Sequence, residues 1–155
     1  MFQNRIIKDL IKIVEENQIN DLISSEELKY PEDKYTDEFI EEIKNLGLMR
    51  IINVKNFIGS KFPYVQLIPN GSLYYIDFID NYDVIYNLVI DYIKNNNDSM
   101  INASDISKEF NIPYVFICTV FKDLERNNLI KLQKTISGLY IRHITERGID
   151  FFNDN

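Results

Sequence analysis

The sequence has very few of the residues that build disulfides and zinc sites. Among its 155 residues there is one cysteine, Cys118, and one histidine, His143. A single cysteine cannot form an internal disulfide, and one cysteine with one histidine are too few ligands for a zinc site of the usual kind. We therefore expect no metal site, and we expect a reducing, cytoplasmic compartment. We interpret Cys118 as a packed side chain and not as a redox sensor.

Motifs for catalysis and cofactor binding are also missing. The five glycines are scattered and form no glycine-rich loop of the kind that cradles phosphate groups. No nucleophile, base and orienting acid occur in a recognisable motif. Adjacent acids such as Glu41 and Glu42 diverge by about 100° on a helix, so a solvated face explains them better than an acid–base pair. The sequence predicts a protein that is not an enzyme and carries no cofactor.

Long apolar runs are absent as well. No stretch approaches the roughly 18 to 20 apolar residues that cross a bilayer. Charged residues interrupt the N-terminal segment every few positions, unlike a signal peptide. We expect a soluble protein with no membrane contact. Its 45% hydrophobic and 26% charged residues are typical of a globular fold.

What the sequence does contain is an internal repeat. Two patterns of apolar, polar and glycine residues recur in the same order, at 45–51 and 67–71 and again at 126–132 and 144–148. Leu48 and Leu129 are 81 positions apart, and Gly71 and Gly148 are 77 apart, so the first hairpin is expected to be about four residues longer. Such a repeat indicates a duplicated unit. We expect two domains, residues 1–78 and 79–155.

Each half is predicted to begin with helices and to finish with a β-hairpin. In the first half, Ser24 or Ser25 and then Thr36 are expected to cap helices, and Gly47 is expected to supply a left-handed turn that ends one. Apolar spacing and β-branched runs predict helices at 3–17, 26–30 and 37–46 and strands at 48–58 and 64–68.

The second half repeats this order. Ser104 is expected to cap the middle helix, and Thr145 a last turn that carries Phe151 and Phe152. The predicted elements are helices at 82–95 and 105–110, an edge strand at 100–102, a third helix ending near 127, and strands at 129–134 and 139–144. The fold class is therefore α+β and mainly α.

The second half resembles a bacterial winged-helix domain. The residues that carry the resemblance are Ile106–Ile112, the helix end Leu124-Glu125-Arg126-Asn127-Asn128-Leu129-Ile130, and the closing Ile144-Thr145-Glu146-Arg147-Gly148. The match covers about 65 residues, and the first half matches more loosely over a similar length. The resemblance implies two tandem winged-helix domains, each of three helices and a β-hairpin wing, as in small bacterial or phage regulators.

In DNA-reading members of that superfamily the third helix enters the major groove. By position, Tyr114 and Thr119 fall in its first turns, and Lys122 and Arg126 lie further along the same helix. The alternative is that residues 115–117 are ordinary core or interface residues and that the wing is a solvated hairpin. The wing residues implied as phosphate contacts are Lys131, Lys134, Thr135, Ser137 and Arg142.

Local charge distinguishes the two halves. The net charge of the chain is -7, which disfavours general attraction to nucleic acid. Residues 112–148 nevertheless hold six bases and three acids, whereas residues 1–48 hold six bases and twelve acids. If the protein binds double-stranded DNA, the second repeat is expected to do so.

Two functional hypotheses remain open. The first is a DNA-binding transcriptional regulator, or a phage- or plasmid-type accessory protein, that uses the C-terminal winged helix. The second is a non-catalytic protein-interaction module that binds no DNA. Surplus aromatics around the junction, where we expect a continuous helix, also predict a homodimer. The residues proposed for protein contacts are Asp37, Glu38, Glu41, Glu42, Tyr75, Phe78, Tyr82 and Tyr86.

Overall fold

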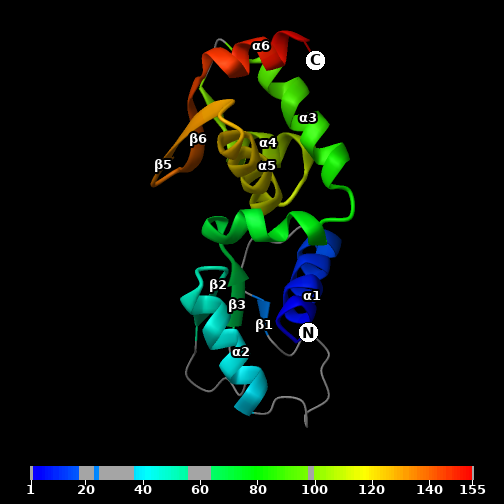
Figure 1. Cartoon of the computed structure of the whole chain (residues 1–155). Coiled ribbons are helices and arrows are strands. Elements are labelled where there is room, and N and C mark those ends of the chain that lie inside the picture. The colour runs from blue at the N-terminus through cyan, green and yellow to red at the C-terminus, as the bar shows by residue number, and fades with distance from the viewer. Residues whose placement is uncertain (1, 18–22, 25–36, 56–63, 98–99, 155) are drawn as a thin grey trace. The chain divides into compact units, whose positions relative to one another are not determined.

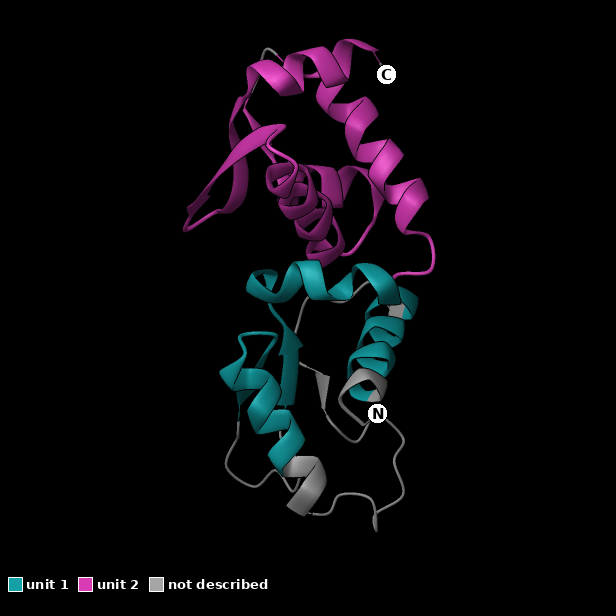
Figure 2. Ribbon diagram, viewed as in Figure 1, with its two compact units in different colours: residues 1–78 teal, residues 79–155 magenta. Residues whose placement is uncertain are grey.

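The fold is α+β and mainly helical, as the sequence predicts (Figure 1). The computed structural model describes residues 2–17, 23–24, 37–55, 64–97 and 100–154, and it describes their side chains except in residues 2–5, 17, 23–24 and 37–40. The chain divides into two compact units, Met1–Phe78 and Ile79–Asn155 (Figure 2).

Unit 1 combines helices with a small antiparallel sheet in the order β1-β3-β2. The helix expected at 3–17 is confirmed, and of its apolar residues at three- and four-residue spacing Ile6, Ile7, Leu10 and Val14 are buried and Ile13 is half-buried. The elements are α1 (Phe2–Asn17), β1 (Ile23–Ser24), α2 (Asp37–Leu48), β2 (Ile52–Lys55), β3 (Tyr64–Leu67) and the 3-10 helix η3 (Pro69–Phe78).

Unit 2 has a sheet of the same topology, in the order β4-β6-β5. The short strand β4 pairs with β6 as β1 pairs with β3, and the hairpin strands are adjacent in both units. The elements are α3 (Tyr82–Asn95), β4 (Ile101–Asn102), α4 (Ala103–Phe110), α5 (Tyr114–Arg126), β5 (Ile130–Thr135), β6 (Gly138–Ile144) and α6 (Glu146–Asp154).

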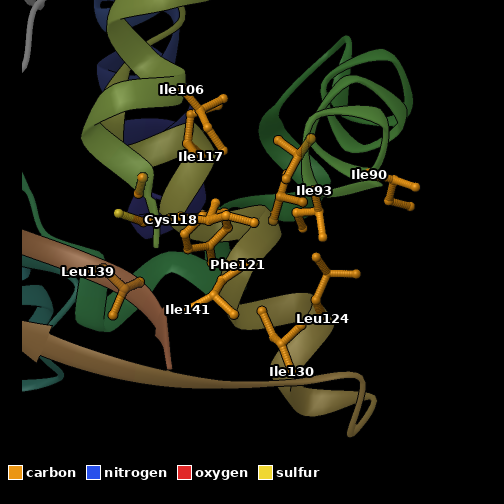
Figure 3. Packing of buried hydrophobic residues seen from close by; sticks show 14 of the residues in the cluster. Ile90, Ile93, Ile106, Ile117, Cys118, Phe121, Leu124, Ile130, Leu139 and Ile141 are labelled. Atoms are coloured by element: carbon orange, nitrogen blue, oxygen red, sulfur yellow. The ribbon is translucent and has the colours of Figure 1, made fainter. Parts of the chain in front are cut away.

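The core of unit 2 gathers around α5 (Figure 3). Ile117, Phe121 and Leu124 recur at helical spacing on this helix and are fully buried. Apolar side chains of α3, α4 and both hairpin strands complete the same cluster, among them Ile93, Ile106, Ile130 and Ile141. The core therefore fixes where the hairpin stands on α5.

The helix before each hairpin, α2 in unit 1 and α5 in unit 2, ends in the same kind of turn. One residue is left-handed in each, Arg50 with φ 59° and Asn128 with φ 61°. The residue that follows donates its N–H to a carbonyl five positions earlier, Ile51 to Leu46 at 3.0 Å and Leu129 to Leu124 at 3.1 Å. The two units therefore share this helix-ending turn.

The turn also corrects the expected alignment of the halves. Gly47 lies inside α2, so the prediction that it supplies the left-handed turn is wrong, and Arg50 does so instead. Leu48 is the last residue of α2, whereas Leu129 lies beyond α5 and matches Ile51, 78 positions before it. Since the closing glycines are 77 positions apart, the two hairpins differ by one residue and not by four.

One expected helix start changes in the structure. α4 begins at Ala103 and not at Asp105, and the predicted Ser104 cap is wrong, because the side chain of Asn102 accepts a hydrogen bond from the Ser104 N–H at 2.9 Å and so caps the helix. The Thr145 cap is confirmed, because its Oγ1 accepts the Gly148 N–H at 3.0 Å. The predicted helix at 26–30 and the Thr36 cap lie outside the described residues.

The expected strands of unit 1 are only partly observed. The strand predicted at 48–58 begins later, at Ile52, because the helix continues to Leu48 and the left-handed turn follows it. Its described part ends at Lys55, and residues 56–58 lie outside the described residues. The strand at 64–68 is confirmed from Tyr64 to Leu67.

A glycine closes each unit against this turn. A Cβ added to Gly148 would overlap the carbonyl oxygen of Leu129 and lie 2.8 Å from Cγ2 of Ile144. A Cβ added to Gly71 would lie 2.7 Å from Cα of Ile51. Neither position therefore has room for a side chain unless the backbone shifts.

Replacing Gly148 with alanine should destabilise the protein by about 2 to 4 kcal/mol, because the added methyl group meets backbone atoms that cannot move aside. Urea unfolding followed by circular dichroism measures this change. The matched control is Gly47→Ala, where the nearest atom to a new Cβ is 3.7 Å away. Alanine in a helix should raise stability there by about 0.5 to 1 kcal/mol. Equal effects of the two changes would contradict the packing described here.

Candidate nucleic-acid interface

The β5–β6 hairpin concentrates positive charge. Residues 126–145 contain three lysine or arginine residues on the hairpin, Lys131, Lys134 and Arg142, as well as Arg126, and they contain no acid. The three hairpin side chains are exposed. This stretch is locally basic although the whole chain carries a net charge of -7.

Strand register places the basic side chains in relation to one another. Lys131 pairs directly with His143 across the hairpin, and a register shift follows between Lys131 and Leu132. Directly opposite side chains on antiparallel strands lie about 5 Å apart, so Lys131 and His143 are neighbours. Glu125 of α5 is engaged with the strand backbone, since its carboxylate accepts the N–H of Leu132 at 2.8 Å. One carboxylate of α5 is thus bound to the backbone of the hairpin.

The tip of the hairpin is a tight two-residue loop. Thr135 and Gly138 are paired, which leaves Ile136 and Ser137 between the strands. The hydroxyl of Thr135 lies 2.9 Å from that of Ser137 and donates to the Gly138 carbonyl at 3.2 Å. Ile136 is fully exposed, and the sequence analysis did not predict an exposed apolar residue at the hairpin tip. The available signal was an apolar residue in the middle of a polar turn.

Tyr114 joins the hairpin to the start of α5. Its hydroxyl accepts the N–H of Leu139 at 2.9 Å, and a Cβ on Gly138 would lie 2.8 Å from the same oxygen. Burial is the main cause that raises the pKa of Tyr114 to about 12. Tyr114 was expected to contact DNA, but in the structure its hydroxyl holds the β5–β6 hairpin through the Leu139 N–H.

The expectation that Thr119 contacts DNA is wrong. Its side chain is fully buried, and its hydroxyl donates to the carbonyl of Val115 at 2.8 Å. Every side chain from Val115 to Phe121 is buried. The alternative for residues 115–117, that they are ordinary packed residues, agrees with this burial. The first turns of α5 therefore offer no polar side chain, other than that of Tyr114, for reading bases.

The far end of α5 carries a small hydrogen-bonded network. Asp123 is 8% exposed and accepts a hydrogen bond from the hydroxyl of Tyr82 at 2.6 Å. The guanidinium of Arg126 forms an ion pair with the same carboxylate but remains 54% exposed. Burial, and then the bond to Asp123, raise the pKa of Tyr82. Arg126 is thus partly engaged, and Lys122 is half-buried.

Several of the aromatic residues expected to bind a protein partner are engaged within their own units. Tyr75 is fully buried, and its hydroxyl is placed to donate to the carbonyl of Ile51 or Ile68, so its expected exposure is wrong. Tyr82 is engaged with Asp123, and the half-buried Tyr86 packs against the core of unit 2. The half-buried Phe78 stacks on Tyr74, at 6.0 Å between ring centroids.

The remaining expectations concern the segment between the two units and the acidic residues of α2. The continuous helix expected there is not formed, because η3 ends at Phe78 and α3 begins at Tyr82. Glu41 is exposed and Glu42 is half-buried on α2. Asp37 and Glu38 belong to α2, but their side chains lie outside the description.

Cys118 is fully buried in the core of unit 2 (Figure 3). Burial is the largest cause that raises the pKa of its thiol to about 12, and the hydrogen bond to Tyr114 opposes it. A thiol that is protonated and inaccessible is a poor nucleophile. This supports the interpretation of Cys118 as a packed side chain.

Comparison with known proteins gives no family. No protein family model matches the sequence, and no curated protein is significantly similar to it. In the described part of the chain, no three histidine, cysteine or acidic residues come together in a group that could hold a metal ion. None of the described helices combines the length and apolar content needed to span a bilayer.

Replacing Tyr114 with phenylalanine should cost about 1 to 2 kcal/mol, because the Leu139 N–H loses its partner in a part-buried site. Urea unfolding checks this, with Tyr140→Phe on the same hairpin as the control. The folded-state pKa of about 12 lies above the ordinary value of 10.0, so the neutral tyrosine stabilises below pH 10 and this contribution disappears as pH rises towards 12. The variant should therefore lose less stability over that range than the wild-type protein. An unchanged unfolding midpoint and alkaline profile would remove the proposed role of Tyr114.

Cys118 should react with a thiol reagent at pH 8 about a hundredfold more slowly in the folded protein than in guanidinium chloride, because burial withholds the thiolate. With an aromatic disulfide as the reagent, each reaction releases an aromatic thiol, and its absorbance measures the rate. Similar rates in both states would show that the thiol is accessible.

Proposed function

We propose that this chain is a DNA-binding protein of tandem winged-helix architecture that grips duplex DNA with the β5–β6 hairpin of unit 2. The single observation that carries the proposal is the acid-free, basic hairpin with its exposed lysine and arginine side chains. A role in transcriptional regulation, in the cytoplasm, is the biological setting that fits such a protein.

The order of elements supports the architecture. In unit 2 a helix and short strand precede the helix pair α4–α5, and a hairpin and final helix follow. The left-handed Asn111 ends α4, and Pro113 precedes α5. This tight turn between two helices supports a helix-turn-helix, in which the hairpin that follows would serve as the wing.

The chemistry of the hairpin favours contact with the phosphate backbone. Lysine and arginine side chains bond phosphate oxygens, and such contacts fix a protein on the duplex without reading its sequence. The buried side chains at the start of α5 leave few groups for base readout in the major groove. We therefore infer a binding mode in which the wing supplies most of the affinity and α5 contributes little sequence recognition.

Charge reversal on the hairpin tests the proposal. Lys131→Glu with Lys134→Glu should weaken binding to a 20-base-pair duplex by about tenfold or more at low salt, because two phosphate contacts become repulsive. The control is Lys8→Glu with Lys12→Glu, which makes the same change in net charge at two exposed positions of α1. Fluorescence anisotropy of labelled DNA measures both.

The salt dependence gives a second readout. Three phosphate contacts predict that log K falls against log salt with a slope of about -3, and each single alanine change on the hairpin should reduce the slope by about one. Absence of binding at low salt, or equal weakening by the hairpin and α1 variants, would reject the hairpin as the DNA contact.

A further inference from the structure

A groove runs along one face of α3 and ends at the last turn of α4. Its volume is about 660 Å³, and its lining residues lie on α3, on α4 or at Asn96, directly after the end of α3. None belongs to the β5–β6 hairpin, so the groove is separate from the proposed DNA contact. The residues between Val84 and Asn95 extend over about three turns of helix, or roughly 17 Å.

The groove has an apolar row. Val84, Leu88 and Tyr92 follow one another at four-residue spacing on α3, which places them in one line. Val84 is 66% exposed and Phe110 of α4 is 38% exposed. The ring of Phe110 meets that of Tyr92 edge to face, at 6.1 Å between centroids. Leu88 and Tyr92 are half-buried and pack on one side against the core of unit 2, so the row leaves part of its apolar surface facing the groove.

A polar row runs beside the apolar one. Asn87, Asp91 and Asn95 are each three residues from a member of the apolar row, so they border it on the same helix. Glu109 provides a second carboxylate at the α4 end. The lining contains two acids and no base, and both carboxylates are exposed. After burial, the negative charges of Glu109 and Asp105 also raise the pKa of Tyr92.

We propose that this groove docks an amphipathic helix of another protein that presents apolar side chains at three- and four-residue spacing and lysine or arginine beside them. Charge complementarity selects this partner, since the two carboxylates at the groove would repel an acidic segment and pair with a basic one. The apolar row matches the spacing of a helix that lies along a groove.

The probe is a fluorescein-labelled peptide of about 18 residues, with leucines at three- and four-residue spacing and lysines beside them, long enough to span the groove. Its partner peptide carries glutamate at every lysine position. Binding of both to the full-length chain is measured by fluorescence anisotropy. The lysine peptide should bind, and the glutamate peptide should bind at least about tenfold more weakly.

Two matched pairs of variants locate the site. Asp91→Lys and Asp150→Lys make the same charge change at exposed acids, inside the groove and on α6. Val84→Ser and Ile149→Ser each remove an exposed apolar side chain, with Val84 in the groove and Ile149 outside it. All four positions are exposed, so the variants should fold, which circular dichroism checks.

The expected result is a loss of lysine-peptide affinity of about tenfold or more for Asp91→Lys and for Val84→Ser, with less than a twofold change for the two α6 variants. Equal weakening by Asp91→Lys and Asp150→Lys would mean general charge attraction and would overturn the proposal. Absence of binding would overturn it as well. So would wild-type self-association that Val84→Ser abolishes, because the groove would then hold a second copy of this chain.

Discussion

The close approach of a glycine to the turn after the preceding helix is the constraint on which the rest of each unit depends. Gly148 lies against the Leu129 carbonyl, and Thr145 ties the same place together by donating its hydroxyl to the Asn128 carbonyl at 2.6 Å. Gly71 makes the equivalent contact with Ile51 in unit 1. Because both strands of a hairpin are anchored at this point, its base cannot swing away from the helix. A side chain at either glycine would force the backbone apart.

Anchoring of this kind holds the exposed basic side chains of the β5–β6 hairpin in a fixed position on unit 2. The β5–β6 hairpin is held at its base by the Leu129 turn and along its length by the hydroxyl of Tyr114 on the Leu139 amide. At physiological ionic strength, charges beyond about 8 Å are largely screened, so the composition of the hairpin itself matters more than the net charge of the chain. This is why an acidic protein is compatible with the proposed contact to phosphate groups. In the proposed binding mode the hairpin, and not the buried start of α5, would make the main contact.

Unit 2 presents two surfaces of opposite chemistry. The hairpin carries exposed lysine and arginine side chains, whereas the groove along α3 and α4 carries two exposed carboxylates beside an apolar row. The two share no residue, so the proposed DNA contact and the proposed basic helix would not compete for the same atoms. Their charges also assign each partner to one surface, since the basic hairpin repels a basic helix and the acidic groove repels DNA. A protein of this kind would link a nucleic acid to a protein partner through one small unit.

The sequence by itself determined the helices predicted at 3–17 and 82–95, the Thr145 cap and the hairpin of unit 2, because apolar spacing and capping are properties of neighbouring residues. It misjudged the match of Leu48 with Leu129 and the Ser104 cap, although the turn after each helix and the Asn102 cap are local hydrogen-bond patterns. Only the tertiary structure decided the burial of Thr119 and Tyr75, because burial depends on residues far away in the chain. Tyr114 and Leu139 are 25 positions apart, and Tyr82 and Asp123 are 41 apart. No local pattern encodes such pairs, and folding brings them within hydrogen-bond distance only through the shared core.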